Sequence, residues 1–381
     1  NIVEDSETEF ERDRRERDID DESLYNQTDL IIRIGDGPVS HTLTAGIEIG
    51  RDYYQNQGYN WEDEPNQSIE NPVYGPMPSS IERTLSTLTD NESESMAFYI
   101  NDQVNLGEHW KLVVGVRKDD FDFSSTVTNN PDPLLNGNFE KNETMSSHRA
   151  GVIYQPDDMQ AYYVSYGTSF NPSAETITLS SANLLVDPEE NRSTEIGAKW
   201  DLLDGGLSLT TALFEVEKTN ARNTDPLTEV VELDGETAVS GFEFSVSGRL
   251  SPAWQVFSAY TNLDGEIVRL DDSDGLPLDG NVLQNTPEHT ASLWTTYEFN
   301  SNWEIGGGAV YSSERMLNNN NTAVTDSYTR YDATAAWQHS RYQLRLNLQN
   351  LTDEDYFEVA SSGRATPAAG TTAILTLISE F

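Results

Sequence analysis

The feature that most constrains this chain is the alternation of apolar and polar residues along many short segments. Because successive side chains of a β-strand point to opposite faces, each segment has one apolar face and one polar face. No run approaches the roughly 18 consecutive apolar residues that a transmembrane helix requires. A barrel wall requires an apolar residue only at every second position. The clearest apolar positions are Tyr342, Leu344, Leu346 and Leu348 in one segment and Phe242, Phe244 and Val246 in another.

These segments predict an all-β protein, a transmembrane antiparallel β-barrel with about sixteen strands in this chain. The first expected strand has the weakest pattern, because residues 11–17 are almost all charged. No segment of comparable length has the period of a helix. The expected strands cover residues 4–16, 23–35, 39–53, 92–105, 108–123, 142–156, 158–170, 191–204, 205–219, 229–250, 252–270, 281–298, 302–315, 326–339, 340–356 and 366–381.

The connections between these segments alternate in length. Every second one is short and rich in Gly, Pro, Asn and Asp, as at residues 35–38 and 203–206. The others are long and polar. Outer-membrane barrels have short periplasmic turns and long extracellular loops, whereas a soluble β-sandwich has no reason to sort its loops. The long connections cover residues 54–91, 124–141, 171–190, 271–280, 316–325 and 357–365.

The composition restricts the partners of the chain. With 65 acidic and 23 basic residues, its net charge of −42 excludes nucleic-acid binding as a general role. The acidic residues recur near the ends of the alternating segments, and we interpret them as a solvated surface that stays soluble in high salt, from a halophilic or marine source. The absence of cysteine excludes disulfides, thiolate metal sites and a cysteine nucleophile.

Aromatic residues recur at the ends of segments, close to the short turns. Tyr and Trp favour the interface between hydrocarbon and water, so this placement predicts a belt in contact with outer-membrane lipid. The alternative is ordinary stabilisation of the sheet by aromatic side chains. The residues concerned are Trp110, Tyr162, Trp200, Trp254, Trp303 and Trp337.

Several motifs, in order across residues 160–381, resemble those of TonB-dependent siderophore receptors. Residues 163–175 are similar to the Tyr-Gly-x-Ser-Phe-x-Pro passage of that family, and residues 194–200 to its Glu-x-Gly-x-Lys strand. Each motif is short, but their common order is specific. Similar passages are found at residues 213–222, 239–243 and 285–294, in the penultimate-strand signature 347–353 with Tyr356, and in the terminal aromatic Phe381.

The resemblance implies a barrel of 22 strands around an N-terminal plug, in the outer membrane of a Gram-negative bacterium. The chain 1–381 is then a partial barrel domain, without the plug and the leading strands. The family's partners are a ferric siderophore, a TonB-type energy complex engaged through the missing N-terminal part, and the barrel assembly machinery, which reads Phe381. No resident cofactor is implied, because iron arrives within the siderophore. Residues 218–222 are most similar to the catecholate branch.

Ferric catecholates are anionic and aromatic, so cationic and aromatic side chains near the long loops are the candidate ligand contacts. The alternative is that these aromatics pack the loops and the arginines pair with the abundant acid. Residues 54–91 hold one base, Arg83, against six carboxylates, which opposes an anionic ligand unless salt screens the repulsion. A neutral or cationic ligand would also explain this imbalance. The candidates are Tyr53, Tyr54, Tyr59, Trp61, Tyr74, Phe170, Arg222, Arg315 and Arg364.

Three arginines, Arg33, Arg117 and Arg345, share the phase of their polar neighbours in the expected strands. We therefore expect them to face the lumen and to pair with carboxylates of the plug or the barrel rather than with the ligand.

No pattern indicates catalysis, since motifs such as Gly-x-Ser-x-Gly and His-Glu-x-x-His are absent. The five histidines are scattered without ligand-like spacing, and residues 271–275 lack most ligands of a calcium loop. Receptor-type import is the leading interpretation. A passive sixteen-stranded porin-like channel is the second, and a barrel fragment with a structural or adhesive role is the third. An outer-membrane enzyme comes last.

Overall fold

The computed structural model describes residues 9–10, 15–61, 67–68, 83–131, 133, 136–172, 187–224, 231–272, 275–361 and 364–379. Fifteen strands form one sheet in which neighbours pair antiparallel in chain order. They are β2 (Arg15–Ile34), β3 (Val39–Trp61), β5 (Arg83–Leu106), β6 (Trp110–Thr128), β7 (Gly137–Asp157), β8 (Gln160–Asn171), β9 (Glu189–Leu202), β10 (Leu207–Thr224), β11 (Val231–Ser251), β12 (Trp254–Arg269), β13 (His289–Asn300), β14 (Trp303–Ser312), β17 (Tyr328–His339), β18 (Tyr342–Gln349) and β21 (Thr372–Ser379).

Three short antiparallel pairs lie outside this sheet. They are β1 (Glu9–Phe10) with β4 (Gln67–Ser68), β15 (Arg315–Met316) with β16 (Val324–Thr325), and β19 (Phe357–Ser361) with β20 (Arg364–Pro367). Among the described residues, no helix has the length and apolar character needed to cross a membrane.

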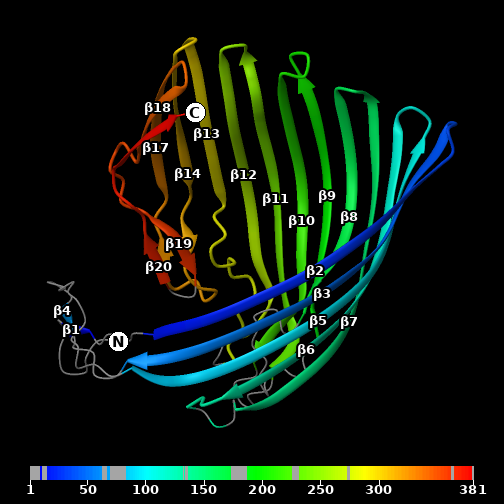
Figure 1. Cartoon of the computed structure of the whole chain (residues 1–381), viewed down its shortest axis with the longest axis vertical. Helices are drawn as coiled ribbons and strands as arrows, with labels where there is room; N and C mark the ends of the chain where they lie inside the picture. Colours follow the sequence, from blue (N-terminus) through cyan, green and yellow to red (C-terminus); the bar gives the residue numbers. More distant parts are fainter. Residues whose placement is uncertain are drawn as a thin grey trace.

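The sheet curves into a wide arc, with its short turns at the upper rim of Figure 1 and its longer connections at the lower rim. The C-terminal end of the chain lies at the upper rim and the N-terminal end at the lower one. In the described part of the chain, β2 and β21 are the two edges of the sheet and do not pair with each other. The expected antiparallel barrel wall is therefore confirmed as an arc.

The sequence-based strand positions are correct where apolar and polar residues alternate and wrong where they do not. The segment 17–22, expected to separate two strands, is continuous strand within β2. Of the expected first strand, 4–16, most lies outside the described residues. The ends of the expected loop 54–91 are also strand, since β3 and β5 stay paired out to Trp61 and Arg83. These extensions carry polar side chains at odd and even positions alike, so their sequences do not alternate.

Near the C-terminal half, three expected strands begin late or end early. Strand β13 starts at His289, so residues 281–288 form a connection rather than strand. Strand β18 ends at Gln349, and the segment 350–356 is turn and coil that stays hydrogen-bonded to β17 through the Leu351 N–H and the Tyr331 carbonyl. Strand β21 starts at Thr372 rather than at residue 366. The expected loops 316–325 and 357–365 contain the short pairs β15–β16 and β19–β20 at their ends.

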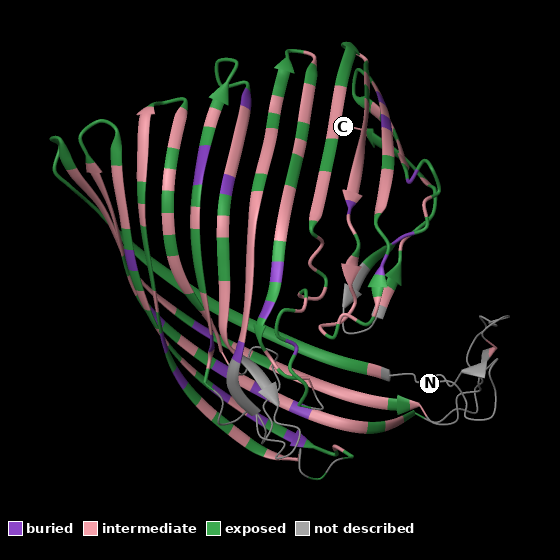
Figure 2. Cartoon of the chain, turned by 180° about the vertical axis from the view of Figure 1, so that it is seen from behind, coloured by how far each residue is buried: buried purple, intermediate pink, exposed green. Residues whose placement is uncertain are grey.

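The two faces of the sheet differ in burial. Along the outer half of β6, odd-numbered residues such as Phe123, Ser125 and Val127 are buried, while even-numbered residues are largely exposed. A similar alternation runs along the outer half of β7, where residues such as Glu143 and Met145 are buried and their neighbours exposed; Figure 2 shows the burial of each strand. On a curved sheet the concave side is the more crowded one, so the odd residues of β6 face inward. We call this the inner face and the opposite one the outer face, and directly paired residues on neighbouring strands share a face.

Close packing on the inner face depends on glycines that lie under aromatic rings. The Tyr99 ring lies directly over Gly46 on the neighbouring strand, where a Cβ atom would collide with it. The Tyr163 ring covers Gly197 in the same way, 2.5 Å from where its Cβ would be. These glycines therefore let large rings lie flat against the wall.

The expected belt of aromatics near the short turns is present on the outer face. The Trp110 and Tyr154 rings lie 4.7 Å apart, and Tyr162 meets Trp200 edge to face at 5.9 Å. The Trp200 Nε1 group donates a hydrogen bond to the Tyr162 hydroxyl (3.1 Å). Trp110 remains about half exposed. The belt therefore exposes apolar ring surface directly beside the polar groups of the short turns.

Candidate functional site

The candidate functional site is the inner face of the wall toward the long connections. Alternation places Arg117 and Arg345 on the inner face, as expected, and both pair with carboxylates of the wall. Arg117 bridges Glu48 (3.0 Å) and Asp119 (2.8 Å), while Arg345 contacts Glu304 at 3.3 Å. The pairing that the sequence predicted for these two arginines is thus confirmed. Arg33 makes no ion pair within the described part of the chain.

Other inner-face cations are neutralised in the same way. Lys141 lies 3.2 Å from Glu143, and the side chains of both are almost completely buried. Lys218 contacts Glu189 at 2.5 Å, and Arg330 contacts Asp332 at 3.0 Å. Because each positive charge has a carboxylate partner, these pairs leave the described wall with little net positive charge for an anionic ligand.

Arg149 on β7 is an exception. Its Nε atom lies 3.1 Å from the position of a Cβ on Gly115, next to the Asn101 amide. It has no ion pair with any described residue, and its side chain is exposed. Together with Gln27 and Tyr99 it lines an inner-face depression of about 310 Å³. A guanidinium in this position can donate hydrogen bonds to a carboxylate or another planar anion.

Aromatic side chains gather on the inner face at the outer ends of β6 and β7. Phe123 is 5% exposed and packs against Phe121 and Phe139. The Phe121 and Phe123 rings are stacked with centroids 6.4 Å apart. The same register row carries Tyr54, Asn91, Ser125 and Phe139 on four successive strands. We call Tyr54, Phe121, Phe123 and Phe139 the inner aromatic cluster.

The candidates on β3 divide between the two faces. Tyr54 belongs to the inner face, whereas Tyr53, Tyr59 and Trp61 belong to the outer face by register with Glu92, Leu85 and Arg83 of β5. All four are strand residues rather than loop residues. Alternation across two adjacent tyrosines is a direct consequence of strand geometry.

The outer-face aromatics of β3 are engaged with neighbouring polar groups. The Arg83 guanidinium lies 3.6 Å from the centre of the Tyr59 ring and 3.0 Å from Glu16. Trp61 Nε1 donates to Glu16 at 3.1 Å, and the Tyr53 hydroxyl donates to Asp90 at 3.3 Å. Desolvation and the negative charge of Asp90 raise the pKa of Tyr53 above its ordinary value. These contacts match the alternative interpretation, in which the aromatics pack the strand extension.

The remaining candidates are placed as follows. Phe170 lies near the end of β8, paired with Glu190, and register puts it on the outer face. Arg315 in β15 donates from its guanidinium to the Phe357 carbonyl (2.6 Å) and to Asn285 (3.3 Å), so it ties two connections together. The backbones of Arg222 and Arg364 belong to β10 and β20. Tyr74 and Phe381 lie outside the described residues.

Sequence reasoning missed Phe121, Phe123, Phe139 and Arg149. The phase of alternation could have found the first two, since both share the parity of Arg117 on β6. Phe139 was placed in a loop, because the polar residues around it hide the strand. Nothing in the sequence distinguishes Arg149 from the paired arginines, because ion pairing also depends on carboxylates of other strands.

The penultimate-strand signature has a structural role at the end of β18. Asn350 is 1% exposed and adopts a left-handed backbone conformation with φ of 52°. Its side-chain Nδ2 donates to the carbonyls of Glu354 (2.9 Å) and Ala369 (3.2 Å), and its Oδ1 accepts from the Glu354 N–H at 2.8 Å. The Asp332 carboxylate accepts from the Asn350 N–H at 2.9 Å. This residue therefore holds the connection between β18 and β21 against β17.

Comparisons with known proteins agree with this architecture. The family model "TonB dependent receptor-like, beta-barrel" matches residues 4–351. The probable TonB-dependent siderophore receptor PiuA of Acinetobacter baumannii is 30% identical across 93% of this chain and 52% of its own length. The metal-pseudopaline receptor CntO of Pseudomonas aeruginosa is 30% identical across 91% of this chain and 49% of its own length.

Solved structures show the same arrangement of strands. The crystal structure of PiuA superposes with a TM-score of 0.88 at 28% identity, covering 95% of this chain and 56% of that one. The closed form of the ferric-catecholate import receptor Fiu from Escherichia coli K12 superposes with a TM-score of 0.84 at 27% identity, covering 96% and 55%. The chain spans about half the length of the curated relatives it matches. On the family match, the curved antiparallel wall and the shared fold, this chain belongs to the TonB-dependent receptor β-barrel family.

Proposed function

We propose that the protein to which this chain belongs is an outer-membrane receptor that binds a ferric siderophore and imports it with energy from a TonB-type complex. The observation that carries the proposal is the family match over residues 4–351, together with two relatives whose names or titles describe siderophore receptors. Short turns and long connections lie at opposite rims, which supports an orientation with the long connections outside the cell, where the ligand enters. A Gram-negative outer-membrane location follows from the same proposal.

The inner aromatic cluster is the proposed ligand-contact surface of this half of the barrel. Tyr54, Phe123 and Phe139 share one face near the long connections, where an incoming ligand arrives first. Aromatic rings stack on planar catechol groups, and a nearby Arg or Lys adds cation–π attraction to the rings. Since the neighbouring cations are paired, ring contact carries more of the recognition here than charge does. Arg149, deeper in the wall, is the proposed anion contact.

The passive porin-like channel is not favoured. A closed sixteen-stranded wall would need its edges to pair, whereas the large sheet of the described residues has fifteen strands and separate edges at β2 and β21. The plug, the leading strands and the role of Phe381 in assembly remain part of the proposal. So does the halophilic source, which is supported by the net charge of −42.

The test uses the complete receptor, expressed in an Escherichia coli host that lacks its own siderophore receptors. We expect uptake of radiolabelled iron from ferric catecholates that disappears when the host lacks TonB. Uptake that persists without TonB and rises linearly with concentration would support the passive channel instead.

Two adjacent tyrosines give a matched pair for the ligand surface. Tyr54→Ala removes an inner-face ring, whereas Tyr53→Ala removes an outer-face ring of the same size. We expect Tyr54→Ala to weaken binding by about five- to tenfold, as for loss of a stacking partner worth 1–1.5 kcal/mol. Tyr53→Ala should leave binding within about twofold of the wild type. Equal effects of the two substitutions would contradict the inner-face assignment.

A further inference from the structure

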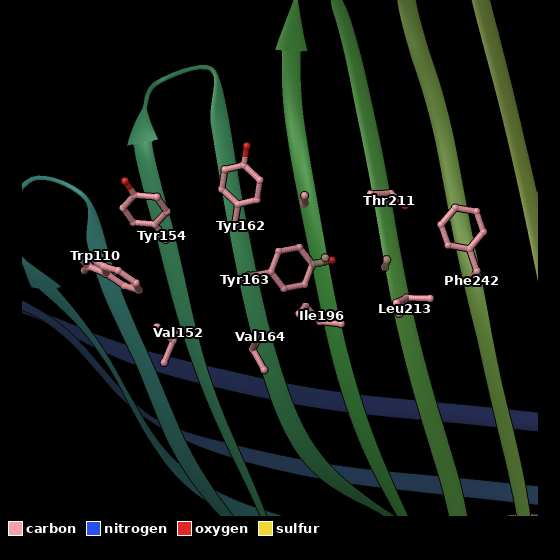
Figure 3. Close-up of a pocket in the computed structure, with 13 residues that line it drawn as sticks. Trp110, Val152, Tyr154, Tyr162, Tyr163, Val164, Ile196, Thr211, Leu213 and Phe242 are labelled. Atoms are coloured by element: carbon pink, nitrogen blue, oxygen red, sulfur yellow. The ribbon is translucent and has the colours of Figure 1, made fainter.

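A shallow apolar groove of about 540 Å³ crosses the outer face below the turn that joins β7 to β8. Its floor is Ala198 on β9, which is only 8% exposed because larger side chains rise around it. Tyr154 and Tyr162 stand on the side of the turn, and Ile196 and Leu213 on the opposite side (Figure 3). The volume falls within the range of about 300–1,000 Å³ that is typical of small-ligand sites.

The position of the groove indicates what fills it. The groove is continuous with the apolar outer face that this family presents to membrane lipid, and it begins at the aromatic belt. The belt lies next to the short turns, so the groove faces the periplasmic leaflet of the membrane. An acyl chain that runs from the belt along Ala198 would bury apolar surface on both partners.

Polar groups at the upper end of the groove are arranged for a headgroup. The hydroxyl groups of Tyr154 and Tyr162 both point toward the turn (Figure 3). Tyr162 donates to Gln160 at 3.0 Å, whereas the Tyr154 hydroxyl makes no hydrogen bond with any described residue. A phosphate oxygen of a lipid is a suitable acceptor for that hydroxyl.

The charges around the turn favour one class of headgroup. The turns above the groove carry the exposed carboxylates of Glu108 and Asp158. The nearby cations belong to the inner face, where Lys111 donates to Gln155 (2.8 Å) and Lys199 lies 5.8 Å from the centre of the Tyr163 ring. The His109 ring is edge-on to Tyr154, with its Nδ1 3.2 Å from the Gln155 carbonyl. An ammonium headgroup therefore meets attraction at this rim, and an anionic headgroup meets repulsion.

We propose that this groove is a binding site for a phospholipid with an ammonium headgroup, of the phosphatidylethanolamine type. The acyl chain lies over Ala198, the phosphate accepts a hydrogen bond from Tyr154, and the ammonium group lies against Glu108 and Asp158. The site is independent of siderophore import, because none of its residues belongs to the inner aromatic cluster.

The test measures quenching of tryptophan fluorescence by brominated lipids. The complete receptor is reconstituted in bilayers that contain increasing fractions of dibrominated phosphatidylethanolamine or dibrominated phosphatidylglycerol. The difference between the wild type and Trp110→Phe isolates Trp110, which lines the groove. We expect half-maximal quenching of Trp110 at a mole fraction about two- to fivefold lower for the ethanolamine lipid, the size of one exposed ion pair.

Matched variants separate the groove from the rest of the outer face. Ala198→Leu fills the floor and should abolish the preference, whereas Ala335→Leu, on the outer face of β17 away from the groove, should keep it. Glu108→Gln with Asp158→Asn leaves the groove intact and should also abolish the preference, which keeps the proposal testable if Ala198→Leu fails to fold. Equal quenching by the two lipids in the wild type would overturn the proposal. So would a preference that survives Ala198→Leu, or no quenching by either lipid, as expected if a second copy of the chain covers the groove.

Discussion

Replacing Asn350 tests whether the turn after β18 fixes the C-terminal end of the wall. Its side chain forms three hydrogen bonds with the backbone of Glu354 and Ala369 in a site that is 1% exposed. Each such bond contributes about 0.5–1.5 kcal/mol, and unsatisfied buried partners cost more. The left-handed φ of 52° adds a second cost of about 1–2 kcal/mol for a residue with an ordinary Cβ. Asn350→Ala should therefore lower the free energy of unfolding by about 3–6 kcal/mol.

Asn350→Gly separates the two contributions, since glycine adopts positive φ without strain. It should lose the hydrogen bonds only and be less destabilised than Asn350→Ala, by about 1 kcal/mol. Asn129 is the matched control, because it also has a positive φ (60°) but is exposed and has no comparable set of bonds. Asn129→Ala should therefore lower stability by about 1–2 kcal/mol, from strain alone.

The assay is urea unfolding of the complete receptor folded into short-chain phosphatidylcholine vesicles, followed by tryptophan fluorescence. The free energies come from the midpoint and slope of each transition. The reasoning is refuted if Asn350→Ala lies within 1 kcal/mol of the Asn129→Ala control. It is also refuted if Asn350→Gly is as stable as the wild type, because the buried hydrogen bonds would then contribute nothing.

Two further predictions use the same unfolding assay. Gly46→Ala should lower the free energy of unfolding by about 1–3 kcal/mol, because the new Cβ displaces the Tyr99 ring. Gly37→Ala is the control and should be neutral, since there is open space around its Cβ. Equal effects of the two substitutions would contradict the packing argument. The outer-face carboxylates of Glu94 and Glu140 lie near one another at the outer ends of β5 and β7. Replacing both with Gln should raise the free energy of unfolding by up to about 1 kcal/mol at 0.01 M salt and have no effect at 1 M salt, where the Debye length falls to about 3 Å. A gain in stability that is independent of salt would exclude charge repulsion as its cause.

The fold was predictable to the extent that apolar and polar residues alternate along the chain. Within the band where every second residue is apolar, the expected strands 158–170 and 252–270 lie within two residues of β8 and β12 at both ends. The extensions of β2, β3 and β5 beyond that band have polar side chains on both faces, so nothing in their composition distinguishes them from loops. Backbone pairing alone makes them strands, and pairing depends on partners that are distant in sequence.

The candidate site was predictable in its chemistry but not in its geometry. Aromatic residues near the long connections were expected as ligand contacts, and Tyr54 remains a proposed one. Tyr53, in the expected strand 39–53, and Tyr59, in the expected loop 54–91, both lie on the outer face, because β3 continues to Trp61 and a strand sends alternate residues to opposite sides. The hydrogen bonds of Arg315 to backbone carbonyls could not be foreseen either, since they join connections that are distant in sequence.

The two faces of a single strand therefore carry the two contacts proposed for this wall. On β6, the even residue Trp110 belongs to the belt and the groove, while the odd residues Phe121 and Phe123 belong to the inner aromatic cluster. A one-residue slip in the register of β6 would exchange these faces, exposing Asp119 to lipid and withdrawing both Phe rings from the lumen. The Arg117 bridge to Glu48 and Asp119 opposes such a slip, because it joins β6 to β3 across an intervening strand. These ion pairs thus contribute more to register than to net stability, and register keeps the proposed lipid contact and the proposed ligand contact on opposite sides of the wall.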